Sequence, residues 1–356
     1  MADRSEGAAG SVGRDDSGER GVAVRRAARA GPERAELGAA LSELRSGLQE
    51  VLVDLERAGP DGAASERASA SEGVGAERFF SIFDELRREL SSLSGSEQLG
   101  EVDAFGLDPD LLRRVRRLLD LLFDRYWRVR VTGSEHLPAV APCLFVSNRS
   151  GLLPYDGLML AHAIARARPE WPRARFLVAD WLMTLPFAQP GLTRLGGVRA
   201  CPENADRLLR AGHPVIAFPE GVKGAAKVFR DRYRLQRFGR GGAIRSALRA
   251  RVPLVPVAVV GAEEAHPILF KSNSSASRAL GLPFLPVTPT FPVLGPLGLL
   301  PLPTRWRIAI GEPMPLPELD GKADPGLEIS RLNELLRARV QGLLDGALAD
   351  RESPWS

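Results

Sequence analysis

The segments FVSNRSGLLPYDG (residues 145–157) and VIAFPEGVKG (residues 215–224) decide the fold of this chain. Each opens with a short apolar run typical of a buried strand, and each then passes into glycine, proline and charged residues. In an open parallel sheet, ligands bind beyond the carboxyl ends of the strands. The two segments therefore predict two strands of one sheet, with the functional residues at their ends.

Further apolar runs extend this pattern in both directions, and helical stretches lie between them. A helix is expected to begin at 108–110 and to run into an alternating strand at 126–131. The later strands are predicted at 143–147, 175–179, 197–200, 214–218, 252–260 and 306–310, and the helices at 155–168, 202–211, 241–251 and 328–348. This alternation favours an α/β fold, an open and largely parallel sheet flanked by helices, over residues 105–348 with a tail at 349–356.

The first 75 residues have a different composition. They contain no aromatic residue and are rich in Ala, Gly, Ser, Arg and Glu, which predicts a mostly disordered arm, with disorder over 1–34 and 58–75. Apolar residues from Leu37 to Leu55 recur at spacings of four and three, so an amphipathic helix is expected near 36–57. This helix serves either to dock on the chain's own core or to support weak self-association. A short helix and linker are expected over 76–104.

Charge and cysteine content set only broad limits. The chain has 48 basic and 44 acidic residues, a net charge of +4, so the global balance singles out no partner. Cys143 and Cys201 are too few for a disulfide framework, and no Cys/His cluster suggests a metal. The N-terminus is charged, and the most apolar stretch, 280–303, carries seven prolines that would break a spanning helix. We expect a cytoplasmic protein that crosses no membrane.

The two opening segments resemble the glycerolipid (lysophospholipid) acyltransferase family. Phe-Pro-Glu-Gly after a strand, here 218–221, is a hallmark of that family. A bacterial subgroup also has a His-x-Gly-x-Leu-Pro-x-Asp motif after a strand that ends in Asn, and here residues 149–156 read RSGLLPYD. The likeness continues through 196–199, 233–242, 252–257, 261–264 and 311–313, and it covers roughly residues 105–348. The order and spacing of these motifs carry the resemblance, which implies a glycerol-3-phosphate acyltransferase-like fold.

The resemblance also implies a reaction. A hydroxyl of a glycerolipid such as lysophosphatidate attacks the thioester of acyl-CoA or acyl carrier protein, and a histidine held by an aspartate takes the proton. The acyl donor is a co-substrate, and no bound cofactor is implied. Asp156 and Arg149 occupy the catalytic positions. The implied substrate-binding residues are Asn148, Gly151, Arg199, Phe218, Pro219, Glu220, Gly221, Lys223 and Arg237.

Arg149 departs from this pattern. A guanidinium keeps its proton at physiological pH, so Arg149 cannot act as a general base, and with Asp156 it can form a plain salt bridge. His162 points away from Asp156 along the predicted helix, and His213 precedes a strand. His266 follows the strand at 252–260, on the side where ligands gather, so it is either a relocated base or a loop histidine with a local hydrogen bond.

Two further segments bear on partners. Residues 207–251 hold twelve basic and two acidic residues with interleaved aromatics, which suits a phosphate or anionic-lipid site, a solvated basic face, or nucleic acid. The resemblance favours the lipid, and no nucleic acid is expected. The uncharged segment 280–303 is either an interfacial flap or a long loop packed over the core. Together the two segments predict peripheral attachment to an anionic cytoplasmic membrane surface.

Two functions stay open. The chain is either an acyltransferase of phospholipid and glycerolipid biosynthesis or a catalytically silent homologue that binds lipid or acyl-CoA and acts as a regulatory module. Residue 149 is the feature that discriminates between them.

Overall fold

The computed structural model describes residues 81–82, 84–86, 88–89, 100–151, 153–186, 188–272, 282–289, 300–317 and 325–351. The chain divides into two units, 1–65 and 66–356, and every described residue belongs to the second. The predicted helix near 36–57 and the predicted disorder at 1–34 and 58–75 lie outside the described residues. In the segment predicted as a short helix and linker, residues 81–82, 84–86 and 88–89 are helical.

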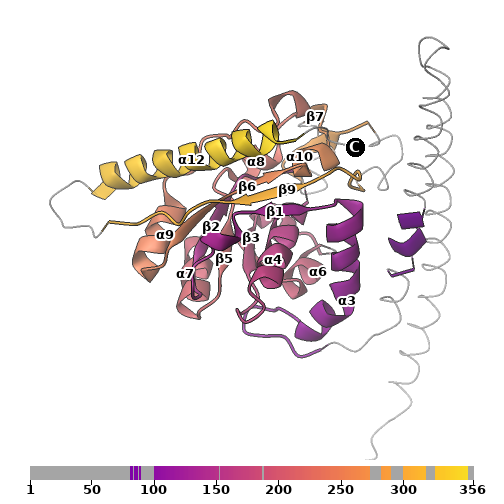
Figure 1. Cartoon of the computed structure of the whole chain (residues 1–356), viewed down its shortest axis with the longest axis horizontal. Coiled ribbons are helices and arrows are strands. Elements are labelled where there is room, and N and C mark those ends of the chain that lie inside the picture. Colours follow the sequence, from indigo (N-terminus) through magenta and orange to yellow (C-terminus); the bar gives the residue numbers. More distant parts are fainter. Residues whose placement is uncertain are drawn as a thin grey trace, which may run out of the picture. The chain divides into compact units, whose positions relative to one another are not determined.

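A seven-stranded sheet forms the centre of the second unit (Figure 1). Its order is β1-β9-β6-β2-β5-β3-β4, and every neighbouring pair is parallel except β6 with β9. The strands are β1 (Arg130–Thr132), β2 (Leu144–Ser147), β3 (Arg175–Val178), β4 (Gly197–Arg199), β5 (Val215–Ala217), β6 (Leu254–Val260) and β9 (Arg307–Ile310). The predicted open, largely parallel sheet is confirmed. A separate antiparallel pair joins β7 (Phe270–Ser272) to β8 (Leu285–Val287).

Helices connect these strands and cover the sheet. The α-helices are α3 (Pro109–Leu121), α4 (Tyr155–Ala167), α5 (Asp180–Met183), α6 (Gln189–Arg194), α7 (Pro202–Arg210), α8 (Gly221–Ala225), α9 (Gly242–Ala250), α10 (Ala262–Ala265) and α12 (Pro325–Ala349). The described residues also include a π-helical turn, η1 (Leu122–Tyr126), and two 3-10 turns, η2 (Ser134–His136) and η3 (Phe229–Asp231). The first turn of α3 is capped by Asp108, whose carboxylate accepts the amide of Leu111 at 2.9 Å.

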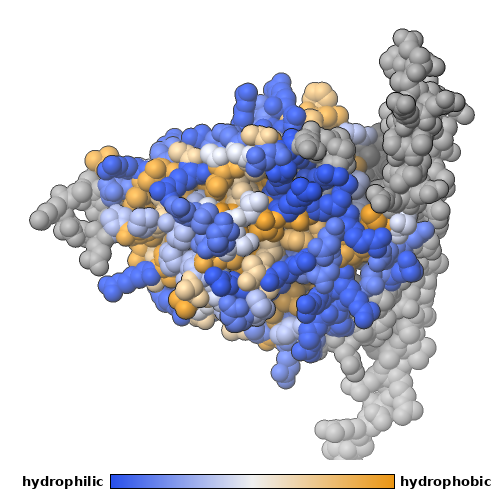
Figure 2. Space-filling view, viewed as in Figure 1, coloured by the Kyte–Doolittle hydropathy of each residue, from blue (hydrophilic) through white to orange (hydrophobic). Residues whose placement is uncertain are grey.

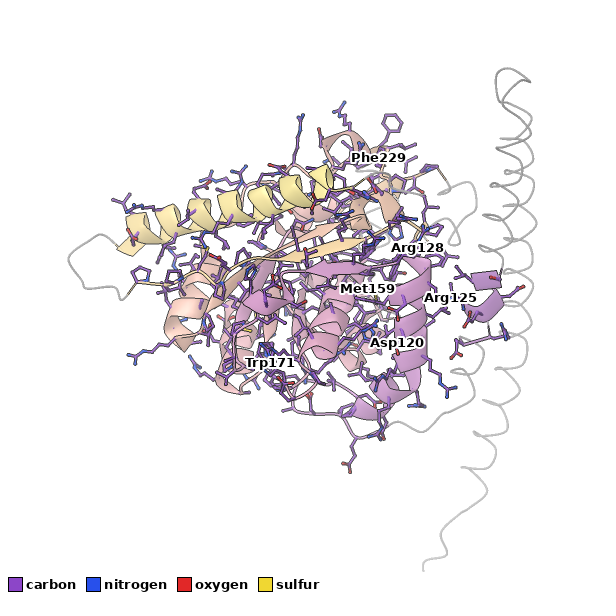
Figure 3. The ribbon with its side chains drawn as sticks, viewed as in Figure 1. Asp120, Arg125, Arg128, Met159, Trp171 and Phe229 are labelled. Atoms are coloured by element: carbon purple, nitrogen blue, oxygen red, sulfur yellow. The ribbon has the colours of Figure 1, made fainter. Side chains whose placement is uncertain are left out.

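The two faces of the sheet bury alternate residues of the same strands. In β6, Val255, Val257 and Val259 belong to the core cluster that includes α3 and α4, while Leu254, Ala258 and Val260 pack with α7, α9 and α12. Every residue of β2, β5 and β6 is buried, as expected where helices cover both faces. Figure 3 labels Met159 of α4, which is fully buried, and Arg125 of η1, whose guanidinium donates to Glu85.

One predicted strand begins later than its alternating pattern suggested. The segment 126–131 starts inside a helix, because the apolar face of α3 continues through η1, where Phe123 and Tyr126 are buried. Strand β1 begins only at Arg130. Between them Trp127 stacks on Trp306 with ring centroids 4.5 Å apart, which joins the end of the helix to the start of β9.

The described parts of the apolar segment 280–303 pack on the domain. Phe284 is buried beside Ala226 and Ile268. The carbonyl of Pro301 accepts the Tyr126 hydroxyl at 2.6 Å. Residues 280–281 and 290–299 lie outside the described residues, so the interfacial flap stays a prediction. Within the described part of the chain, no helix combines the length and the apolar character that crossing a bilayer requires.

Candidate functional site

The centre of the sheet brings the two opening segments together. Strand β2 lies between β6 and β5, so the residues after β2 and those after β5 leave the sheet side by side. Asn148 then turns its side chain back into the sheet. Its Nδ2 donates to the Val259 carbonyl at 2.9 Å, and its Oδ1 accepts the Val259 amide at 2.8 Å. This predicted substrate-binding residue therefore extends the pairing of β2 with β6 by one position and fixes where Arg149 begins.

Arg149 and Asp156 form a buried ion pair. Arg149 Nη1 donates to Asp156 Oδ1, and the two residues are 6% and 0% exposed. Asp156 also accepts the amides of Ser150 and Gly157, each at 2.8 Å. The ring centroid of Phe218 lies 5.3 Å from the Arg149 guanidinium carbon. Burial raises the pKa of the Asp156 carboxyl, while the Arg149 charge and the two amides act in the opposite direction.

Glu220 ties this pair to the loop after β5. Its Oε1 accepts the Arg149 amide at 2.8 Å, and its Oε2 accepts the Gln236 amide at 2.7 Å. Arg149, Asp156 and Glu220 are thus brought together at the carboxyl ends of the strands. Gly224 permits this close packing, because a Cβ there would lie 2.8 Å from the Arg149 Cβ and 2.6 Å from the Glu220 Cβ.

A buried lysine stands behind Glu220. Lys227 Nζ lies 3.3 Å from Glu220 Oε2 and donates to Glu263 Oε1 at 2.7 Å. Burial alone would lower the pKa of Lys227, but the Glu263 and Glu220 carboxylates reverse the direction and raise it. Sequence reasoning missed this network. Its signal was weak, because Lys227 is one of twelve basic residues in 207–251 and Glu263 entered only through a motif likeness.

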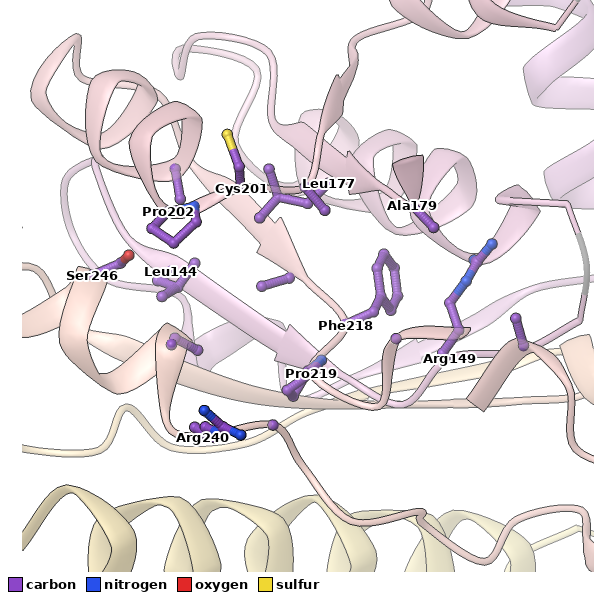
Figure 4. Close-up of a pocket in the computed structure, with 18 of the residues that line it drawn as sticks. Leu144, Arg149, Leu177, Ala179, Cys201, Pro202, Phe218, Pro219, Arg240 and Ser246 are labelled. Carbon is purple, nitrogen blue, oxygen red and sulfur yellow. The ribbon is translucent and has the colours of Figure 1, made fainter. Parts of the chain in front are cut away.

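A cavity of about 300 Å³ opens beside the ion pair, between the sheet and the helices α7 and α9. Small residues of these helices leave the space. Its walls include Leu144, Leu177 and Ala217 from the strands, Ala200, Cys201, Pro202 and Ala205 from the α7 region, and Gly242, Ala243 and Ser246 from α9. Arg149, Phe218, Pro219 and Gly221 also line it, so four of the predicted site residues share this cavity. In Figure 4, Arg149 lies at one end beside Phe218 and Ala179, whereas Cys201, Pro202 and Ser246 lie at the other.

Other predicted residues lie around the cavity or apart from it. Arg199, at the end of β4, is largely exposed and forms two hydrogen bonds to Asp180 at 2.8 and 3.0 Å. Lys223 and Arg237 are exposed. Gly151 has φ +69° and is buried in the loop between β2 and α4.

His266 is buried on the other side of that loop. It stacks on Tyr155 with ring centroids 5.7 Å apart and planes at 3°. It lines a separate space of about 10 Å³, together with Gly151, Lys227 and Glu263. His266 is not among the described residues that line the cavity beside the ion pair. Its role as an alternative base stays a prediction.

The basic segment 207–251 does not form one uniform face. Arg249 pairs with Asp206 at 2.8 Å, and Lys227 is buried. Arg230, Arg234, Arg237 and Arg240 are exposed. Arg240 also lines the cavity beside the ion pair, near the start of α9. The basic residues of 207–251 are therefore of two kinds, the buried Lys227 and exposed arginines such as Arg230 and Arg240.

Comparison with known proteins gives three findings. The sequence profile of the family described as Acyltransferase matches residues 128–260. The uncharacterized proteins Mb0514 of Mycobacterium bovis and Rv0502 of Mycobacterium tuberculosis are each 42% identical to this chain over 254 residues, which is 71% of this chain and 71% of theirs. A crystal structure of PlsC, the 1-acyl-sn-glycerophosphate (LPA) acyltransferase of Thermotoga maritima, is similar at a TM-score of 0.42 and 18% identity, over 68% of this chain and 80% of that one.

Proposed function

Because the chain belongs to the acyltransferase family, we propose that its cleft binds a fatty acyl group and a glycerolipid, and that it transfers the acyl group only slowly. The donor is acyl-CoA or acyl carrier protein, and the acceptor is a hydroxyl of a glycerolipid such as lysophosphatidate. The observation that carries the proposal is the buried Arg149–Asp156 ion pair at one end of an apolar cavity. The cavity supports acyl binding, and the ion pair accounts for the slow transfer.

The slow transfer follows from the proton that the reaction must move. When a hydroxyl attacks a thioester, its proton has to leave as the carbon–oxygen bond forms and the thiolate departs. Arg149 is permanently protonated and cannot accept that proton. Asp156 is held by three donors and is fully buried. Alignment of donor and acceptor in one cleft can still give a residual rate.

The ion pair also favours a second function, a binding module without turnover. In that case the cleft holds an acyl chain or acyl-CoA, and the bound state acts on a partner. Both functions use the cavity, and they differ only in whether transfer of the acyl group can be measured.

Filling the cavity tests the acyl-binding part that both functions share. Ala205 of α7 is buried and lines the cavity, so Ala205→Phe should weaken binding of a long-chain acyl-CoA roughly tenfold or more, the cost of overpacking. Ala211, at the end of the same helix, is exposed, and Ala211→Phe serves as the matched control. Calorimetric titration of the three proteins measures the effect. Equal affinity in all three would show that acyl chains bind elsewhere.

We also propose that the surface formed by Leu269, Phe270 and Arg230 attaches to an anionic membrane. Phe270 of β7 is 71% exposed, and its neighbour Leu269 is 43% exposed. Phe229 donates its amide to the Ile268 carbonyl at 2.7 Å, which brings exposed Arg230 next to this hairpin. Figure 2 shows apolar atoms projecting where β7 lies, while hydrophilic side chains gather over α3. Exposed apolar and basic side chains side by side support two-signal binding.

Vesicle flotation tests this attachment. Phe270→Ser should weaken binding to phosphatidylserine-containing vesicles about tenfold, because an inserted Phe contributes about 1.5–3 kcal/mol. Leu327 of α12 is equally exposed, at 71%, and Leu327→Ser should leave binding unchanged. Binding by the unaltered protein should weaken as salt rises. Equal flotation on neutral and anionic vesicles, or none on either, would contradict the proposal.

A further inference from the structure

The cavity beside the ion pair joins an apolar interior to a buried cation. Leu144, Leu177 and Ala217 supply the sheet wall, and the helices supply small side chains opposite. Arg149 is 6% exposed and lies at one end, beside the Phe218 ring. A volume of about 300 Å³ is at the lower limit of ordinary ligand pockets. An elongated apolar ligand with one anionic end matches both features.

We infer that this cavity binds a free fatty acid, with the alkyl chain between the sheet and α7 and α9 and the carboxylate on the Arg149 guanidinium. The inference rests on the proposed function, because it assigns a ligand to the same cavity. A guanidinium presents a planar fork of donors that matches a carboxylate. In a site shielded from water such a charge-assisted hydrogen bond is little screened. A thioester or an ester carries no charge at that position, so its carbonyl oxygen forms a weaker hydrogen bond with Arg149 than a carboxylate does.

Asp156 does not neutralise the whole positive charge at the Arg149 end of the cavity. Its carboxylate also accepts the Ser150 and Gly157 amides and lies in the first turn of the thirteen-residue helix α4, whose positive end faces it. The cavity gains further positive potential from Arg240 and from the first residues of α9, Gly242 and Ala243, which line it. Glu220 and Glu263 share Lys227, at 3.3 Å and 2.7 Å, and neither carboxylate lines the cavity. The charged side chains among the described lining residues, Arg149 and Arg240, are both positive, so the lining itself favours an added carboxylate.

The test compares two ligands of equal chain length on the unaltered full-length protein. Laurate and methyl laurate are titrated by calorimetry at pH 8, and lauroyl-CoA is titrated in parallel. Laurate should bind roughly tenfold more tightly than its methyl ester, because only laurate forms a charged hydrogen bond. Since this comparison needs no substitution, it does not depend on the folding of a variant.

The variant Arg149→His then locates the charge. At pH 8 its imidazole is less protonated than at pH 6, so the preference for laurate should be much smaller at pH 8 than in the unaltered protein and should be partly restored at pH 6. Equal binding of laurate and its ester by the unaltered protein, with lauroyl-CoA also bound, would overturn the fatty-acid inference and leave the proposed function standing. Binding of none of the three would overturn both. A preference for laurate that survives in Arg149→His at pH 8 would place the carboxylate elsewhere and also overturn the inference.

Discussion

Arg149→His should raise the rate of acyl transfer from acyl-CoA to lysophosphatidate roughly 10²–10⁴-fold, the usual contribution of a general base. The reason is that Asp156, the other member of the catalytic pair, is already in place. Asp156 is buried, fixed by the Ser150 and Gly157 amides, and oriented toward position 149. An imidazole there would have a carboxylate beside it to hold its tautomer and stabilise its charge. Initial rates of the two purified proteins under identical conditions measure the effect.

The control is the same substitution with the carboxylate removed. Arg149→His combined with Asp156→Asn should lose most of the gain, because the imidazole then has no anion to orient it. Rapid turnover by the unaltered protein that survives Asp156→Ala would refute the account and point to another base. His266→Ala would then be the variant to examine, although His266 lines a different space.

Lys227→Met should lower the free energy of unfolding by about 3–5 kcal/mol, as breaking a buried ion pair does. The lysine is 9% exposed and lies between Glu220 and Glu263, so its loss leaves two buried carboxylates without a cation. Lys223 is exposed four residues earlier, and Lys223→Met should change stability by no more than about 0.5 kcal/mol. Urea denaturation of the three proteins makes the comparison.

The pH dependence of the Lys227→Met deficit adds a second check. Burial raises the pKa of Glu263 even in the unaltered protein. Without the lysine, the Glu263 carboxyl in the folded state should hold its proton above the pH at which the unfolded chain releases it. The variant is then relatively more stable at acid pH and loses stability as pH rises through the folded-state pKa. The deficit should be larger at pH 8 than at pH 5, and a deficit independent of pH would argue against unpaired carboxylates.

The fold was predictable because its signals are local and repeated. The strands β2 to β6 and β9 coincide with short apolar runs, and α4, α7, α9 and α12 with longer helical patterns between them. The short helices α5, α6, α8 and α10 have four to six residues each, too few to display a helical period. The end of the first helix was placed before Tyr126, although the π-helical turn Leu122–Tyr126 includes it, because the alternating residues from Tyr126 onward match a strand equally well.

The site was predictable in part. The motif spacing indicated that Arg149, Asp156 and Glu220 meet, and their hydrogen bonds join them. The spacing gave no sign that Asn148 turns into the sheet toward Val259, because that contact depends on a partner 111 residues away. The cavity could not be predicted from the sequence either, because it is formed by small residues on two helices that face each other only after folding. Contacts of this kind depend on tertiary packing and leave no periodic trace in the sequence.

The central claim is that a permanently charged Arg149, paired with Asp156, occupies the place of a titrating base. The pH dependence of transfer from acyl-CoA, measured in the unaltered protein and in Arg149→His between pH 5.5 and pH 8.5, tests this most directly. We expect a slow rate without an inflection in the unaltered protein. In the variant we expect a rate that rises with an apparent pKa between about 6 and 8, where an imidazole beside a carboxylate titrates. A histidine-like inflection in the unaltered protein, at the amplitude of the variant, would contradict the central claim.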